Sequence, residues 1–481
     1  MSFFVFFRII FLLLAIISIT FIFPILTAVY YQEFSTISAF VIPGVFCILI
    51  AAVLYFIGKK KKITFTPKDP FIIVAGAWIA ASLLGAIPFI ISNTIPSFTD
   101  AFFESVSGFS TTGATILSDV ESLPNSINLW RCQMHWLGGM GIVALTVALL
   151  PLLGVGGFQL IKAETTGPEK GKVTPKIATT AKILWFIYLG FTVIQTVLLK
   201  VAGMDWFNAI AHTFSTLGTG GFSTKNNSIA SFNSASIEWI CTVFMFLAGI
   251  NFSLFYFLFT GKLDEIKQNS ELKAYALIVF VSIVGITLFL LPSAESFASK
   301  IRAAAFQTTA IISTTGFASQ NFVLWPSGAQ LFILLLMFIG GSSGSTSGGV
   351  KVVRWVVFSK QMTNEMRRML HPHGIFSIRL NGRAGRKDVV FSVAAFLFLY
   401  FILVFITAVI ASLSGIDAIS SFTAALAMIG NIGPGLGAVG PAENFGFFAD
   451  GIKWWFSFMM IAGRLELYTI ILLFVPDFWK K

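Results

Sequence analysis

Charged residues are scarce in this chain of 481 residues, and their scarcity decides its class. Only 11% of the residues are charged, whereas 56% are hydrophobic, and the mean hydropathy is +0.87. Soluble domains carry about 25% charged residues, so a soluble globular protein is excluded. Apolar runs of about 20 residues, the length of a membrane-spanning helix, recur along the chain, but the alternating strands of a membrane β-barrel do not. The sequence therefore predicts an all-α integral membrane protein.

Cysteine and histidine are also rare, which argues against a disulfide scaffold, a metal centre and an active site. The three cysteines, Cys47, Cys132 and Cys241, lie in or beside apolar runs and are predicted to be buried thiols. His371 and His373 look like a metal pair, but they lie in a basic loop with no third ligand nearby. No Ser/His/Asp set or carboxylate pair is present either, so we expect neither an enzyme nor an organic cofactor.

The net charge of +11 is explained by membrane topology rather than by nucleic-acid binding. Lysines fill 59–62 directly after an apolar run, and further Lys and Arg residues crowd the segment 351–387. Because such residues gather in cytoplasmic loops, we expect these segments and both termini to be cytoplasmic, with no nucleic-acid partner. A signal peptide at the N-terminus is the alternative for the first 20 residues, but no small-residue cleavage site follows and a second apolar run comes soon after.

Ten apolar segments are long enough to be membrane spans, and an even number agrees with termini on one side. They lie near 3–30, 36–58, 70–93, 128–153, 183–202, 235–260, 273–292, 328–358, 389–413 and 452–476.

The four outer connections repeat one pattern, an apolar segment of half-membrane length followed by a cluster of small residues. The clusters are "STTGAT" (110–115), "GTGGFS" (218–223), "STTGFA" (313–318) and "GNIGPG" (430–435), and they align on Gly113, Gly221, Gly316 and Gly433. A repeat of this kind predicts four copies of one unit. We expect an N-terminal pair of spans followed by four span–pore helix–filter–span units, arranged with pseudo-fourfold symmetry around one pore.

Four irregular loops at membrane depth must be buried in protein or line water. Their backbone carbonyls could ring one axis and replace the water shell of a potassium ion, since glycine reaches the positive φ values that turn carbonyls inward. The alternative for any single cluster is a turn that lets helices pack closely. The predicted filter residues are Thr111, Thr112, Gly113, Thr219, Gly220, Gly221, Thr314, Thr315, Gly316, Asn431, Ile432 and Gly433.

Acidic residues gather on the outer side and leave two interpretations open. They either concentrate cations at the pore entrance or merely reflect the lack of Lys and Arg there. The residues are Asp100, Glu104, Asp119, Glu121, Asp205, Glu238, Glu295, Asp417, Glu443 and Asp450.

The four loops, together with "FSTLGTGGFST" (214–224) and "FIGGSSGSTSGGVKVVR" (338–354), resemble the Trk/Ktr/HKT superfamily of potassium transporters, and the extra N-terminal pair of spans resembles its TrkH type. This resemblance implies a filter formed by the four aligned glycines, a homodimer with one pore per protomer, and a separate cytosolic TrkA-like nucleotide-binding ring. It divides the chain into 1–66 (N-terminal pair), 67–165, 166–265, 266–375 and 376–481 (repeats 1 to 4).

Two features predict a gate below the filter. The segment 340–349 contains only glycine, serine and threonine, so it should break the helix of 328–358 at membrane depth. It is not a nucleotide-binding P-loop, because Lys351 follows Val350 instead of the last glycine. Arg464 lies in an apolar segment, where a charge is costly and by default functional; pairing with Glu466 or snorkelling is the alternative.

The resemblance implies that this loop blocks the pore and that Arg464 projects into it. The predicted gate residues are Gly340, Gly341, Ser342, Ser343, Gly344, Ser345, Gly348, Gly349 and Arg464.

The resulting functional prediction is potassium uptake across a bacterial inner membrane, with potassium as the transported ion and lipid as the surrounding medium. The alternative is a secondary cation symporter with alternating access, coupled to protons or sodium. Such transporters show inverted repeats with paired broken helices, whereas the four units here run in one orientation.

Overall fold

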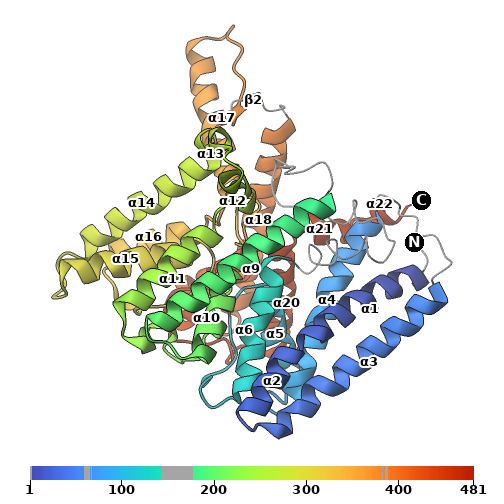
Figure 1. Ribbon diagram of the computed structural model, residues 1–481. Helices are drawn as coiled ribbons and strands as arrows, with labels where there is room; N and C mark the ends of the chain where they lie inside the picture. Colours follow the sequence, from blue (N-terminus) through green and yellow to red (C-terminus); the bar gives the residue numbers. More distant parts are fainter. Residues whose placement is uncertain are drawn as a thin grey trace.

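The computed structural model describes residues 3–58, 66, 68–141, 177–381, 383–384 and 388–480. This part of the chain is built almost entirely from helices packed into one body (Figure 1), and several of them are long and apolar enough to span a membrane, which confirms the predicted all-α membrane class. Its only strands are β1 (Arg379–Leu380) and β2 (Arg383–Ala384), which form a short antiparallel pair.

The N-terminal helices pack as a separate layer against the rest of the protein. They are α1 (Phe3–Thr20), α2 (Ile22–Tyr30) and α3 (Phe34–Gly58). Phe21 is buried, and its ring lies 4.9 Å from that of Trp130 in α6 (Asn125–Gly139). The Glu33 carboxylate accepts hydrogen bonds from the backbone N–H groups of Asn125 and Ser126, at 2.6 and 2.9 Å. An acid at the start of a helix is favoured by the helix dipole, so this contact joins the layer to α6.

The first helix and the pore helix of each unit have the predicted lengths. The four first helices are α4 (Asp69–Ile91), α9 (Ile177–Val201), α14 (Ser270–Leu290) and α18 (Asp388–Ser412). The four pore helices are α5 (Phe98–Phe109), α10 (Trp206–Leu217), α15 (Phe297–Ile312) and α19 (Ala418–Gly430). Short 3-10 turns follow the filter loops in three units, at Ser228–Phe232, Phe322–Leu324 and Gly437–Val439.

The last segments of units 2 and 4 depart from the prediction of one continuous span. The segment 235–260 is divided into α11 (Ala235–Ala248) and α12 (Phe252–Phe259), bent by 93°. The segment 452–476 is divided into α20 (Asp450–Arg464) and a part from Tyr468 to Phe474 bent by 112°, which comprises α21 (Tyr468–Ile471) and the 3-10 turn Leu472–Phe474.

The remaining two inner segments belong to units 3 and 1. The segment 328–358 becomes α16 (Ser327–Met337) and α17 (Val352–Leu370), joined by the predicted break. In the first unit α6 ends at Gly139, and most of the rest of the predicted span 128–153 lies outside the described residues. By length and composition, six described helices can each cross a membrane, or eight if each bent pair counts as one span.

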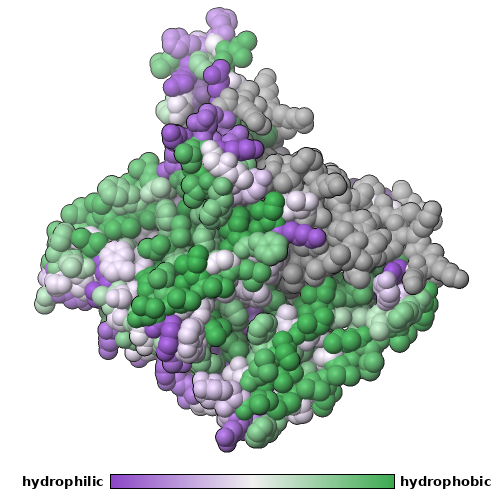
Figure 2. Space-filling view, in the orientation of Figure 1, coloured by the Kyte–Doolittle hydropathy of each residue, from purple (hydrophilic) through white to green (hydrophobic). Residues whose placement is uncertain are grey.

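Several long helices present an apolar surface to the outside of the protein. Figure 2 shows hydrophobic side chains over α1, α3, α9 and α11, and mainly hydrophilic ones where α17 projects from the body. The exposed side chains of Val45, Phe56 and Phe186 belong to this apolar surface, which suits contact with lipid.

Both ends of the described chain lie on the same side of the body (Figure 1). Arg8 near the start of α1 donates a hydrogen bond to the carbonyl of Gly58 at the end of α3. Lys68, at the start of α4, donates to the carbonyl of Lys480 next to α22 (Pro476–Trp479). Gly58 and Lys68 are close in sequence, so these contacts bring the two termini to one face.

Candidate functional site

Four capped pore helices bring the small-residue loops together. Each begins after a residue whose side-chain oxygen accepts a hydrogen bond from a backbone N–H of the first turn, namely Ser97, Asp205, Ser296 and Asp417. Such N-caps define where a helix starts. Each helix ends directly before its loop, so its C-terminal partial negative charge faces the loops and favours a cation there.

All four loops share one backbone conformation. The four filter glycines have φ between 74° and 93°, and the residues two positions earlier, Thr111, Thr219, Thr314 and Asn431, have φ between 53° and 57°. The residue between each pair does not have positive φ, so handedness alternates and successive carbonyls can turn to one side. Non-glycine residues enter the left-handed region only at a cost, and its recurrence at four matched positions indicates a constraint imposed by the assembly.

The loops close into a ring, as the lack of space for a side chain beside each filter glycine shows. A Cβ at Gly433 would lie 2.7 Å from the carbonyl oxygen of Thr112, and at the other three glycines it would lie closer still to the matching oxygen of the next loop. The contacts run from Gly113 to Gly220, from Gly221 to Thr315, from Gly316 to Ile432 and from Gly433 to Thr112. The order is unit 1 to 2, 2 to 3, 3 to 4 and 4 back to 1, so four carbonyl oxygens lie around one axis.

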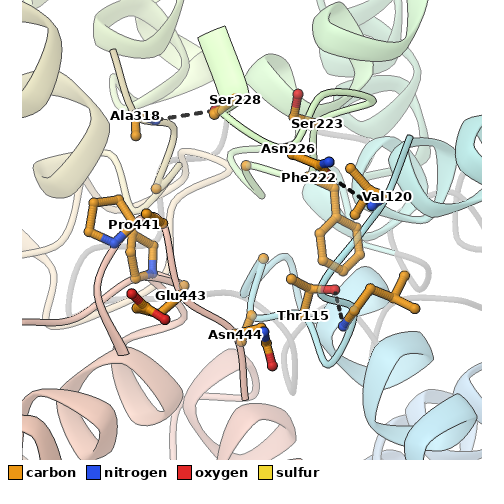
Figure 3. Close-up of a pocket in the computed structure, with 18 of the residues that line it drawn as sticks. Thr115, Val120, Phe222, Ser223, Asn226, Ser228, Ala318, Pro441, Glu443 and Asn444 are labelled. Carbon is orange, nitrogen blue, oxygen red and sulfur yellow. Dashed lines mark hydrogen bonds between the residues drawn. The ribbon is translucent and has the colours of Figure 1, made fainter. Parts of the chain in front are cut away.

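A cavity of about 110 Å³ opens above this ring, and all four filter glycines line it. Figure 3 shows its walls: Thr115 and Val120 from unit 1, Ser223 and Asn226 from unit 2, and Glu443 from unit 4. The glycine backbone of all four loops is therefore accessible from this cavity.

The side chains of the filter loops form a frame around the ring. Ser110 and Thr112 share a hydrogen bond of 2.7 Å between their hydroxyls, and Ser313 and Thr315 repeat it at the same distance. Asn431 donates from Nδ2 to Thr112 Oγ1 at 2.9 Å, which ties unit 4 to unit 1. All the predicted filter residues lie in their expected loops, and all are buried except Gly113, Gly221 and Gly316. The hydroxyls of Thr112 and Thr315 anchor the extended backbone of their loops.

A buried ion pair supports the ring from behind. Arg131 and Glu104 lie 2.8 Å apart with side chains 1% and 0% exposed. Glu104 also accepts hydrogen bonds from Thr115 Oγ1 and the Ile116 N–H, directly after the first filter loop. Arg131 donates to the Ser223 carbonyl of the second loop. The pair therefore holds two adjacent loops, and the expectation that Glu104 belongs to a water-facing acidic mouth is wrong.

We expect Glu104→Gln to destabilise the protein, because it leaves Arg131 buried without a counter-charge. Breaking such a pair costs about 3–5 kcal/mol, seen as a lower midpoint of thermal unfolding in detergent. Glu121→Gln is the matched control, because the Glu121–Lys225 pair is 41% and 36% exposed and exposed pairs contribute about 0–1 kcal/mol. Equal losses from the two substitutions would contradict a special role for the buried pair.

Several other acidic residues of the outer side also form ion pairs or hydrogen bonds. Asp100 pairs with Lys453 at 2.6 Å, and Glu238 pairs with Arg302 at 2.8 Å. A hydrogen bond from Asn226 lowers the pKa of Asp119, and one from Lys225 lowers the pKa of Glu121. Both carboxylates therefore stay ionised when the medium is mildly acidic, so the rim keeps its negative groups.

The predicted intramembrane loop lies inside the protein on the inner side of the ring. Residues 338–351 separate α16 from α17 without helix, as predicted. Ser342 donates from its N–H to the Gly249 carbonyl at 2.8 Å, and the Phe252 N–H donates to the Gly344 carbonyl at 3.0 Å. The loop thus forms hydrogen bonds at the break between α11 and α12, which satisfies backbone groups that lipid could not.

Arg464 joins this loop to the first unit. Its guanidinium donates to the Thr346 carbonyl at 2.7 Å, and to the carbonyls of Gly138 and Gly139 at 2.7 and 2.9 Å. Glu466 instead pairs with Arg354, so the alternative of an Arg464–Glu466 pair is not what the structure contains. A cationic side chain therefore bridges two units below the ring.

Residues that the sequence reasoning missed also hold the loop. Glu271, at the start of α14, accepts hydrogen bonds from the N–H groups of Ser343 and Val353, at 2.7 and 3.0 Å. Lys351 is buried and donates to the carbonyl of Ser347. No sequence signal links Glu271 to a loop more than 70 residues away, because its partners are backbone groups.

The sequence does carry a signal for the breaks that follow the last helix of each unit. A pair of small residues lies at or near the end of the last helix of each unit: Gly138-Gly139, Ala248-Gly249, Gly340-Gly341 and Ala462-Gly463. At Gly463 a Cβ would collide with the Ile429 carbonyl, and at Gly138 with the Phe109 carbonyl. These two pairs therefore let α6 and α20 approach the ends of the pore helices α5 and α19 closely.

Histidine serves packing near the ring. The His135 ring stacks on Phe222 with centroids 4.2 Å apart, and His212 hydrogen-bonds Ser223 Oγ at 2.9 Å. Among the described residues, no group of three or more His, Cys, Asp or Glu residues could hold a metal ion.

Comparison with known proteins gives full-length matches. The model of the TrkH family, described as cation transport protein, matches residues 36–481. The Trk system potassium uptake protein TrkH of Escherichia coli (strain K12) is 39% identical over 480 residues, which cover 98% of this chain and 99% of that protein. The crystal structure of the potassium transporter TrkH from Vibrio parahaemolyticus matches with a TM-score of 0.88 at 36% identity and covers 100% of both chains. The similarity therefore includes every filter loop and the intramembrane loop.

Proposed function

Because this chain belongs to the TrkH family of cation transport proteins, we propose that it takes up potassium through the ring of four loops. The family resemblance expected from the sequence is thereby confirmed, and the chain is a transporter rather than an enzyme. Its relatives are named as potassium uptake proteins.

The cyclic contact of the four filter glycines with the next loop's carbonyls carries this proposal. A potassium ion sheds its water where carbonyl oxygens replace it, and the four oxygens of Thr112, Gly220, Thr315 and Ile432 lie at one level of the ring. The alternating φ values add further carbonyl levels next to it. We propose that the predicted filter residues bind the ion through these backbone oxygens.

We propose that the segment 340–349 and Arg464 form the gate. The loop lies on the inner side of the ring, and Arg464 fastens it to α6 through three carbonyl groups. A guanidinium on the ion path raises the electrostatic barrier for a cation. Ions would pass when Arg464 releases Thr346 and the loop withdraws.

Orientation and partners follow from the charge distribution. The termini lie on the face where α3 ends at Gly58, and four lysines follow Gly58 in the sequence. Because such residues gather in cytoplasmic segments, we propose that this face is cytoplasmic in a bacterial inner membrane. A homodimer with one pore per protomer and a cytosolic TrkA-like regulatory ring complete the proposal, as the family resemblance implies. We also propose that the four repeats begin at residues 67, 166, 266 and 376.

Radiotracer flux tests the proposal. The purified protein in liposomes should take up rubidium, and excess potassium should compete while sodium competes at least tenfold less well. Liposomes without protein are the control. Equal competition by sodium would refute the selective ring. Uptake that requires a proton or sodium gradient would favour the symporter with alternating access.

A further inference from the structure

One peptide of the intramembrane loop touches the filter itself. The N–H of Gly348 donates a hydrogen bond of 2.7 Å to Thr314 Oγ1. Thr314 is the residue with positive φ two positions before filter glycine Gly316. The other end of the same peptide, the carbonyl of Ser347, accepts a hydrogen bond from the buried Lys351 ammonium. The peptide thus lies between the filter and a positive charge.

The contact is tight on the side of unit 4 as well. A Cβ at Gly348 would lie 2.6 Å from the Gly430 carbonyl oxygen and 2.8 Å from Asn431 Cβ. The loop therefore presses its backbone against the inner ends of two filter loops, with no room for a side chain. This close approach explains why glycine occupies position 348.

Two of the matched positions keep a side-chain oxygen without a partner. Within the described residues, Thr111 Oγ1 and Asn431 Oδ1 are buried and make no hydrogen bond. Buried acceptors without a partner are costly and call for an explanation. Thr111, Thr314 and Asn431 occupy the same place in three of the four loops, at the level where the Gly348 N–H arrives. These oxygens suit a dehydrated monovalent cation.

We propose that the Thr314–Gly348 hydrogen bond is a latch, so that closure of the loop and occupancy of the innermost cation position exclude each other. This inference rests on the proposed function and adds its regulation. In the closed state the Gly348 N–H, the positive end of a peptide backed by Lys351, points to an oxygen that a cation would need. Withdrawal of the loop removes that N–H and frees the Thr314 hydroxyl to face the ion.

Thermodynamic linkage makes the effect reciprocal. A cation that binds only when the loop is withdrawn must favour the withdrawn loop. Potassium itself is therefore an opening ligand, and a variant with a loosened loop must bind the ion more tightly. One hydrogen bond corresponds to roughly a three- to tenfold change in this equilibrium.

Chemical modification of the loop tests the latch. Ser345 in the loop is partly exposed, whereas the three native cysteines are buried. In full-length protein carrying Ser345→Cys, the rate of reaction with a water-soluble thiol reagent should rise roughly three- to tenfold between zero and saturating potassium. Thr314→Val, which keeps the shape but removes the acceptor, should react fast at zero potassium and lose the dependence. Thr314→Ser should keep it.

Each contrary result is distinct. A rate independent of potassium, in protein whose rubidium flux is potassium-selective, would overturn the latch and leave the proposed function intact. Equal acceleration by sodium and potassium would contradict the selective filter instead. If Thr314→Val does not fold, Lys351→Gln replaces it, and it should speed the reaction at zero potassium because the peptide loses its backing charge. A Lys351→Gln rate equal to that of the parent would count against the latch.

Discussion

Replacing Gly316 by alanine should reduce potassium-selective rubidium flux by roughly 30-fold or more. The added methyl group meets the carbonyl oxygen of Ile432 in the next loop, so the fourth strand must move away from the axis. Left-handed backbone at a non-glycine residue costs about 1–2 kcal/mol, and overpacking adds about 1–3 kcal/mol. Each 1.4 kcal/mol corresponds to about tenfold in an equilibrium. Flux into proteoliposomes with potassium or sodium as competitor measures the loss.

Gly415 offers a matched control for this substitution. Its φ of 76° is close to the 74° of Gly316, but a Cβ there would have nothing within 4 Å. Gly415→Ala therefore imposes the same backbone strain without entering the ring, and its flux should stay near that of the parent protein. If both substitutions reduced flux equally, backbone strain rather than closure of the ring would be responsible.

Replacing Arg464 by alanine should raise basal rubidium flux by roughly tenfold or more. The loop loses its tie from Thr346 to a guanidinium, and hydrogen bonds to charged groups contribute about 1.5–3 kcal/mol. The proposed ion path also loses a positive charge. The measurement is flux into liposomes without any cytosolic partner, where the closed loop should otherwise limit transport.

Two further substitutions separate the tie from the charge. Arg464→Lys keeps the charge but lacks the planar guanidinium that bonds Thr346, Gly138 and Gly139 at the same time. Flux should therefore rise less than in the alanine variant. Arg464→Gln removes the charge and retains one donor group. A folded alanine variant with unchanged or lower flux would show that Arg464 is structural rather than part of the gate.

The opposite directions of these effects have one physical origin. The ring needs four backbone strands at close distance, so any added atom harms it. In the gate that we propose, a few charge-assisted contacts between units hold the loop, so removing one of them should release it. Glu104 and Arg131 support the ring, because their ion pair holds the backbone that follows two of the filter loops.

The sequence by itself determined the membrane class, the four small-residue loops after half-length helices, and the Gly/Ser/Thr break. These features are written in local composition and spacing: apolar runs of span length, half-helices, and one glycine at matched places. Glycine at position 113 and its counterparts adopts positive φ without steric cost, whichever way the chain continues. The sequence also carried the small-residue pairs at the inner helix ends, although reading them as helix ends required the structure.

Only the tertiary structure decided which groups meet. Asn431 bonds Thr112 across 319 residues of sequence, and Gly348 bonds Thr314 across two different segments of unit 3. It also showed that Glu104 is buried, that α11 and α20 end at breaks, and that Glu271 and Lys351 hold the loop. The reason is that a buried ion pair, a backbone carbonyl and a packed glycine find their partners through the arrangement of helices, which no periodicity within a single segment encodes.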